Sequence, residues 1–138
     1  MRVLLTSAAL LLAAGPAAAF TAVNGLNVQD LPQSGQFEVI SSRGAGPREI
    51  WCAGAQFAHF RQGGQGNTRL YIVKGLSPSA SQPARKSVIF TTRPDAALAN
   101  GPKPGDDGNY SVSLKKIGFN LRLAHAEGFC ENVFDEFD

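Results

Sequence analysis

The N-terminus limits how much of this chain can fold and where it folds. Arg2 precedes an apolar run from Val3 to Ala14, and the tripeptide Ala17-Ala18-Ala19 follows shortly after it. A positive start, an apolar stretch too short to span a bilayer and an A-x-A tripeptide are typical of a secretory signal peptide. We therefore expect residues 1–19 to be removed and the exported chain to begin at Phe20. The alternative is an uncleaved N-terminal anchor.

Residues 20–138 are enough for one domain with one hydrophobic core and too few for two. The chain carries 13 Lys and Arg against 11 Asp and Glu, a formal net charge of +2, and cleavage removes one positive charge with Arg2. This balance makes no general electrostatic case for binding nucleic acid. Since Phe20 is not the cysteine that a lipoprotein signal requires, we expect no membrane anchor after cleavage, and a periplasmic or secreted location.

Cys52 and Cys130 are the two cysteines of the chain. An even number in an exported protein favours a disulfide, and a reactive thiol is the alternative. A bridge of this span would contribute roughly 4–5 kcal/mol in the chain-entropy treatment, as an upper figure. The sequence has no C-x-x-C pair and no H-E-x-x-H motif, so we predict neither a zinc site nor another cofactor.

One helix is predicted from Pro47 to Arg61. Proline suits the first turn of a helix, and Gly63-Gly64 is a stop signal. At 100° per residue an apolar stripe should face the core, whereas Cys52 and His59 point the other way. A disulfide would then clamp the C-terminal segment onto the polar back of this helix. The stripe comprises Ile50, Ala53, Gly54, Phe57 and Phe60.

The rest of the chain is predicted to form short strands and loops. In Gln36–Ser42, Phe37 and Val39 share one face, and Glu38 and Ile40 share the other. We expect exposed loops at 76–85 and 93–109. The fold class is therefore α+β, with one helix on a small, mostly antiparallel sheet. The other expected strands are a hairpin over 20–28 that turns at Asn24-Gly25, then Leu70–Lys74, Ser87–Thr92, and a region from Tyr110 to Leu123 with a bulge or turn near Lys115-Lys116.

Catalytic templates find little support. The sequence contains no G-x-S-x-G, no P-loop lysine motif and no third glycine for G-x-G-x-x-G. Cys52 and His59 would lie about 10 Å apart along a helix, too far for thiol activation. His125 could reach Cys52 through tertiary folding, which leaves a thiol enzyme or hydrolase open. We interpret Asp106-Asp107-Gly108-Asn109 as a turn, because the spaced ligands of a calcium loop are missing.

The C-terminal segment is rich in carboxylates and aromatic rings. Two interpretations compete: a partner-binding tail, and a last segment that buries its aromatic rings and leaves its carboxylates in water. We favour the second, because the disulfide would tether this segment. The carboxylates are Glu131, Asp135, Glu136 and Asp138, and the apolar residues are Val133, Phe134 and Phe137.

Several short segments together resemble a group of small exported alphaproteobacterial proteins with one disulfide and no assigned function. They are the F-T-A-V-N-G-L run from Phe20, Trp51-Cys52 in the helix, the strand Arg69–Val73, and the late Cys130. The resemblance implies export and the helix-to-tail disulfide, and it supplies no catalytic or cofactor-binding residues. We expect a non-enzymatic binding or accessory module of the cell envelope with an envelope or extracellular partner. A small secreted thiol enzyme or hydrolase that uses Cys52 and His125 is the alternative.

Overall fold

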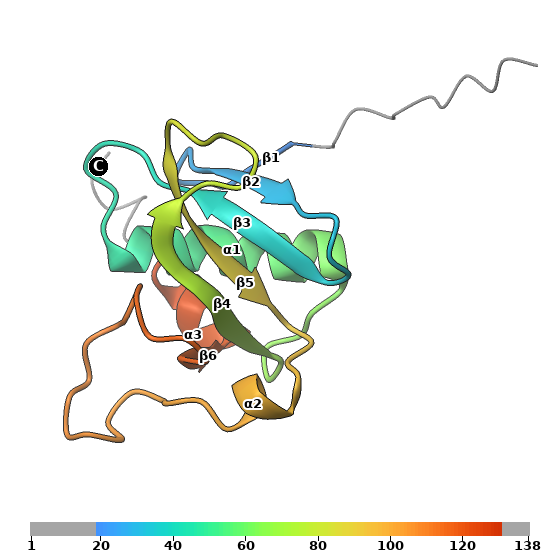
Figure 1. Ribbon diagram of the computed structural model, residues 1–138. Helices are drawn as coiled ribbons and strands as arrows, with labels where there is room; N and C mark the ends of the chain where they lie inside the picture. The colour runs from blue at the N-terminus through green and yellow to red at the C-terminus, as the bar shows by residue number, and fades with distance from the viewer. Residues whose placement is uncertain (1–18, 131–138) are drawn as a thin grey trace, which may run out of the picture.

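A six-stranded antiparallel sheet forms the framework of the protein in a computed structural model that describes residues 19–130. The strand order is β1-β2-β3-β5-β4-β6, and α1 lies against one face of the sheet (Figure 1). The predicted α+β class, with one main helix on an antiparallel sheet, is confirmed. The elements are β1 (Phe20–Thr21), β2 (Asn27–Asp30), β3 (Gln36–Ile40), α1 (Pro47–Gln62), β4 (Arg69–Pro78), β5 (Lys86–Thr91), α2 (Ala96–Ala99), β6 (Asn120–Arg122) and α3 (Leu123–Gly128).

Helix α1 begins and ends as the sequence predicts, one residue later at its C-terminus. The side chain of Glu49 accepts a hydrogen bond from the backbone N–H of Gly46 at 3.0 Å, which satisfies one of the free donors at the helix start. Gly63 takes the left-handed conformation at φ 70°. The N–H of Gly64 then bonds back to the carbonyl of Ala58 at 2.9 Å, the usual way in which a glycine ends a helix.

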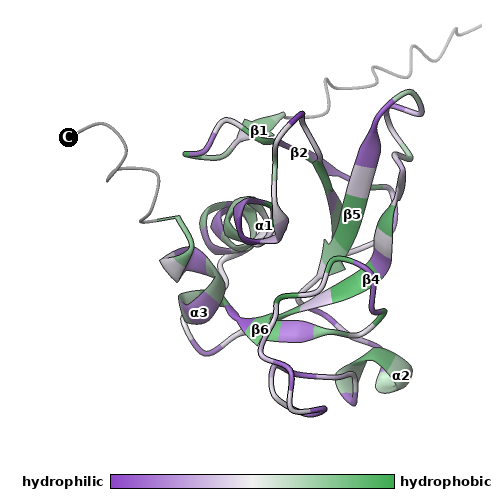
Figure 2. Ribbon diagram, turned by 90° about the vertical axis from the view of Figure 1, so that its left-hand side faces the viewer, coloured by the Kyte–Doolittle hydropathy of each residue, from purple (hydrophilic) through white to green (hydrophobic). Residues whose placement is uncertain are grey.

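The core lies between α1 and the sheet, as the side view shows (Figure 2). Trp51 is fully buried and packs edge-on against Phe90 and Phe119. Its indole N–H donates to the carbonyl of Ser113 at 2.8 Å, so its polar group is satisfied. A Cβ atom placed at Gly54 would lie 3.2 Å from the Phe90 ring and 3.3 Å from the Leu70 side chain. The glycine therefore allows the helix to approach the sheet closely.

The predicted disulfide is present and joins α1 to the segment after α3. Cys52 and Cys130 are bonded, with their Cα atoms 5.2 Å apart, so the helix-to-tail clamp is confirmed. His59 Nδ1 lies 2.9 Å from Glu127 Oε1 across the two helices. The guanidinium of Arg48 lies 5.6 Å from the centre of the Phe129 ring. α3 thus packs against the face of α1 that the sequence marks as polar.

One residue of the predicted core stripe of α1 needs correction, and Cys52 does not. Cys52 is fully buried, as expected on a helix face that the segment tethered by the disulfide covers. Phe60, placed in the core stripe, is 65% exposed. Phe57 occupies the position against Phe37, with ring centroids 4.5 Å apart, whereas Phe60 stacks on His59.

The strand boundaries also need correction in the second half of the chain. Of the region 110–123, only Asn120–Arg122 is a strand, and Leu123 opens helix α3 instead of continuing it. The chain does bend at residues 114–118, near the predicted break. The expected loop 76–85 starts as strand, because β4 extends to Pro78. Ser79, just beyond it, is buried.

Two expectations fall outside the described residues. All of the predicted signal peptide except its last residue lies in residues 1–18, and the acidic C-terminal segment lies in residues 131–138. Within residues 19–130, no helix is both long and apolar enough to cross a membrane.

Candidate functional site

The cysteine and histidines singled out in the sequence do not assemble a nucleophile in this structure. The sulfur of Cys52 is bonded to Cys130. His59 pairs with Glu127, and His125 lies on α3, with its ring 5.3 Å from that of Phe129. A thiol enzyme needs a thiolate, which this disulfide does not supply. Within residues 19–130, no group of three or more His, Cys, Asp or Glu side chains could hold a metal ion.

Glu38 is a fully buried carboxylate on the sheet face opposite α1. We call Glu38 with Ser79, Ser81 and Ser87 the serine clasp. The Ser79 hydroxyl donates to Glu38 at 2.6 Å and the Ser87 hydroxyl at 2.7 Å, and the Ser81 hydroxyl donates as well. The backbone N–H groups of Ala80 and Ser81 each add a bond at 3.1 Å.

The clasp explains why a charge can be buried there. Burial raises the pKa of the Glu38 carboxyl, but the hydrogen bonds from Ser79, Ser81 and Ser87 outweigh burial and lower the pKa from 4.5 to about 2. All three hydroxyls point their protons at the carboxylate, and no histidine belongs to the group. The clasp therefore anchors the 79–85 loop to the sheet, and a carboxylate with so low a pKa is a poor general base for activating a serine hydroxyl.

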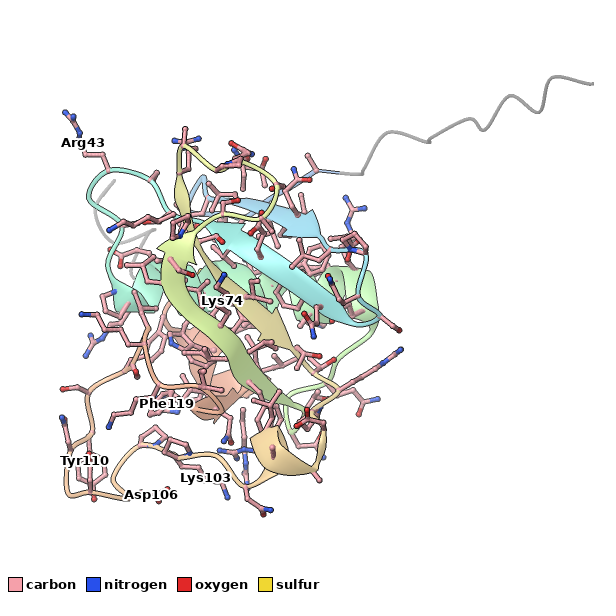
Figure 3. All side chains as sticks on the ribbon, viewed as in Figure 1. Arg43, Lys74, Lys103, Asp106, Tyr110 and Phe119 are labelled. Carbon is pink, nitrogen blue, oxygen red and sulfur yellow. A yellow bond between two sulfur atoms is a disulfide. The ribbon has the colours of Figure 1, made fainter. Side chains whose placement is uncertain are left out.

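A basic cleft of about 430 Å³ lies at the other end of the molecule, where β4, β6, α3 and the 100–119 loop meet. Figure 3 shows Lys103 and Tyr110 on that loop, with Arg43 at the opposite end of the molecule. Three of the lining residues are cationic and a fourth is a histidine, and no acidic side chain from residues 19–130 lines the cleft. The lining residues are Arg69, Lys103, Pro104, Tyr110, Leu121, Arg122 and His125.

Asn120 orients one of these cations. Its side-chain oxygen accepts a hydrogen bond from the Nε–H of Arg69 at 2.6 Å. Its amide nitrogen lies within donating distance of three backbone carbonyls, 2.9 Å for Gly118 and 3.3 Å each for Gly101 and Pro102. Asn120 is completely buried. The Arg69 guanidinium is thus held at one edge by a rigid group, and its terminal nitrogens remain for a ligand.

The loop that carries Lys103 and Tyr110 is folded into hydrogen-bonded turns. Asp106 accepts the backbone N–H of Lys103 at 2.8 Å. Asp107 pairs with Lys116 at 3.2 Å, and the pKa of Asp107 is lowered by the backbone N–H of Asn109 and by Lys116. The predicted turn at residues 106–109 is therefore present. Loop 93–109 also contains the short helix α2, which the sequence analysis did not foresee.

Neither the clasp nor the cleft was predicted from the sequence. Glu38 was assigned to a strand face with no partner, and the signal available was a strand carboxylate together with a serine-rich segment that begins at Ser77. The cleft draws its residues from three stretches of the chain, at 69, 103–110 and 121–125, the first of them far from the other two. Arg69 begins β4 and Arg122 ends β6, but only the pairing of these two strands brings the arginines together.

Comparison with known proteins identifies no relative: no family model, no curated protein and no solved structure matches the chain.

Proposed function

We propose that this protein is a small, non-enzymatic binding module of the cell envelope, and that its basic cleft binds an anionic ligand. The observation that carries the proposal is the cleft lining: three cationic side chains and a histidine, no acidic side chain from residues 19–130, and an arginine fixed by a buried asparagine. Converging cations attract and orient anions, and a guanidinium held in place loses less freedom on binding.

Three further features support a binding role. The cleft volume of about 430 Å³ lies in the range typical of small-molecule sites, roughly 300–1,000 Å³. Pro104 and Leu121 give it an apolar part beside the cations. The disulfide holds the Cys130 segment, next to α3, on α1, so the wall that carries His125 is tied to the core.

The test is a titration of isotope-labelled protein with phosphate, sulfate and citrate at low ionic strength, followed by NMR. The backbone signals of Arg69, Lys103, Arg122 and His125 should shift together and saturate. Arg122→Ala should weaken binding, whereas Arg43→Ala, which removes the same charge from an exposed site far from the cleft, should not. Equal weakening by both variants, or no saturable shift, would refute the proposal.

Export needs its own test. The full chain expressed in a Gram-negative host should be recovered outside the cytoplasm with the mass of a protein that begins at Phe20, because Ala17 and Ala19 occupy the cleavage positions. A cytoplasmic protein that retains residues 1–19 would contradict the envelope location and leave the anion-binding test unaffected.

A further inference from the structure

Two arginines of the cleft occupy directly opposite positions on paired strands. Arg69 and Arg122 are direct cross-strand partners in the β4–β6 pair. Side chains in such positions have Cβ atoms about 4.5–5.5 Å apart, and like charges there are destabilising. Neither arginine belongs to an ion pair found within residues 19–130. Within the part of the chain that the structure describes, the pair thus retains a local repulsion that a bound anion would remove.

The geometry favours an anion with two charges on one group. Arg69 is anchored through its Nε–H, and Arg122 approaches from the next strand with an exposed side chain. One carboxylate brings a single negative charge to this pair of positive charges. A phosphate monoester brings a charge of about −1.5 to −2 near neutral pH and three acceptor oxygens, enough for both guanidinium groups.

An aromatic ring lines the same cleft as the arginine pair. Tyr110 lines the cleft and is 79% exposed, an unusual exposure for a large ring. A Cβ atom at Gly105 would lie 2.7 Å from the Tyr110 ring, and Gly105 has φ 88°. The glycine therefore lets the ring pack directly on the backbone of the loop. A ring supported on one side and open on the other offers a surface for stacking.

We infer that the ligand of the cleft is a phosphate monoester attached to a planar ring, with the phosphate between Arg69 and Arg122 and the ring on Tyr110. This inference rests on the proposed anion-binding function and specifies its ligand class. A nucleoside monophosphate and an aryl phosphate share this chemistry. The cleft is small enough that we expect a small molecule rather than a polymer.

Calorimetric titration with matched probes tests the inference. The probes are adenosine monophosphate, cyclic adenosine monophosphate and adenosine, which carry the same base with a dianion, a monoanion and no charge. We expect the monophosphate to bind at least about tenfold more tightly than the cyclic ester, since a second charge faces a second guanidinium. Adenosine should show no measurable binding. Phenyl phosphate distinguishes an aryl phosphate from a nucleotide as the ligand. Whichever of phenyl phosphate and adenosine monophosphate binds more tightly carries the ring that fits the cleft better.

Variants separate the two contacts. Arg122→Ala should remove most of the preference for the monophosphate over the cyclic ester, Arg122→Lys should retain part of it, and Arg43→Ala should retain all of it. Tyr110→Ala should weaken the binding of the monophosphate several-fold and leave the binding of inorganic phosphate unchanged. If the monophosphate and the cyclic ester bind equally at the cleft, the inference is wrong and anion binding stands. If no anion shifts the cleft signals, the proposed function itself fails.

Discussion

The serine clasp and the basic cleft differ in whether the chain compensates the charges that it gathers there. At the clasp, one buried carboxylate receives hydrogen bonds from three hydroxyls and two backbone N–H groups, all from this chain. At the cleft, two arginines are cross-strand partners, and none of the described residues that line the site is acidic. A charge that the fold satisfies itself serves stability, whereas charges that the fold gathers and leaves uncompensated are available for a partner.

Removing the disulfide should have the largest effect, and it separates the two regions. We expect Cys52→Ser and Cys130→Ser each to lower the free energy of unfolding by roughly 2–5 kcal/mol. The double variant should be hardly worse, because each single change breaks the same bond. Thermal or urea unfolding measures this. If the wild-type protein is insensitive to reductant and all variants melt alike, the clamp has no stabilising role.

The same disulfide variants should destabilise the local structure of the cleft more than that of the clasp. The Cys130 segment, which follows α3 and its cleft residue His125, is tied to α1 by the disulfide, whereas the clasp lies on β3, β5 and the 79–85 loop. Hydrogen exchange should therefore rise in α3 before it rises at Ser79–Ser81. Equal loosening of both regions would contradict this separation.

Acid should destabilise the protein through Glu38. Its pKa in the folded protein is about 2, below the ordinary 4.5. The clasp therefore stabilises fully above about pH 4.5 and loses its contribution as the pH falls toward 2, a change of about 3 kcal/mol. Urea unfolding across this range measures the slope. Glu38→Gln should be less stable at neutral pH, and its pH profile should lack this component; an unchanged profile would show that the carboxylate is not held as described.

Local signals allowed part of this structure to be predicted. Pro47 and Gly63 placed α1 within one residue, and the cysteine pair indicated the clamp. Helix α3 was not predicted, because Leu121 and Leu123 continue the alternating pattern of a strand. Residues 123–128 are helical where they pack against α1. Its N-cap, Arg122, makes no side-chain capping bond that would mark the start.

The candidate site depends on features that are not local. The strand order places β4 between β5 and β6, which puts Arg69 opposite Arg122 although β5, α2 and the loops around them separate 69–78 from 120–122 in the chain. Likewise, Glu38 meets its serines because the 79–85 loop returns over the sheet face. Neither pairing leaves a pattern in neighbouring residues, so the hydrophobic periodicity that identified the strands carried no information about them.

The most direct measurement is the coupling between Arg69 and Arg122. A double-mutant cycle with Arg69→Ala, Arg122→Ala and the double variant, followed by urea unfolding at low ionic strength, isolates their interaction. In the free protein we predict an unfavourable coupling of about 0.2–1 kcal/mol. In saturating adenosine monophosphate the coupling should change sign, because both arginines then share the phosphate. A favourable coupling in the free protein, or one that the ligand leaves unchanged, would contradict the inference that the cleft binds a dianion.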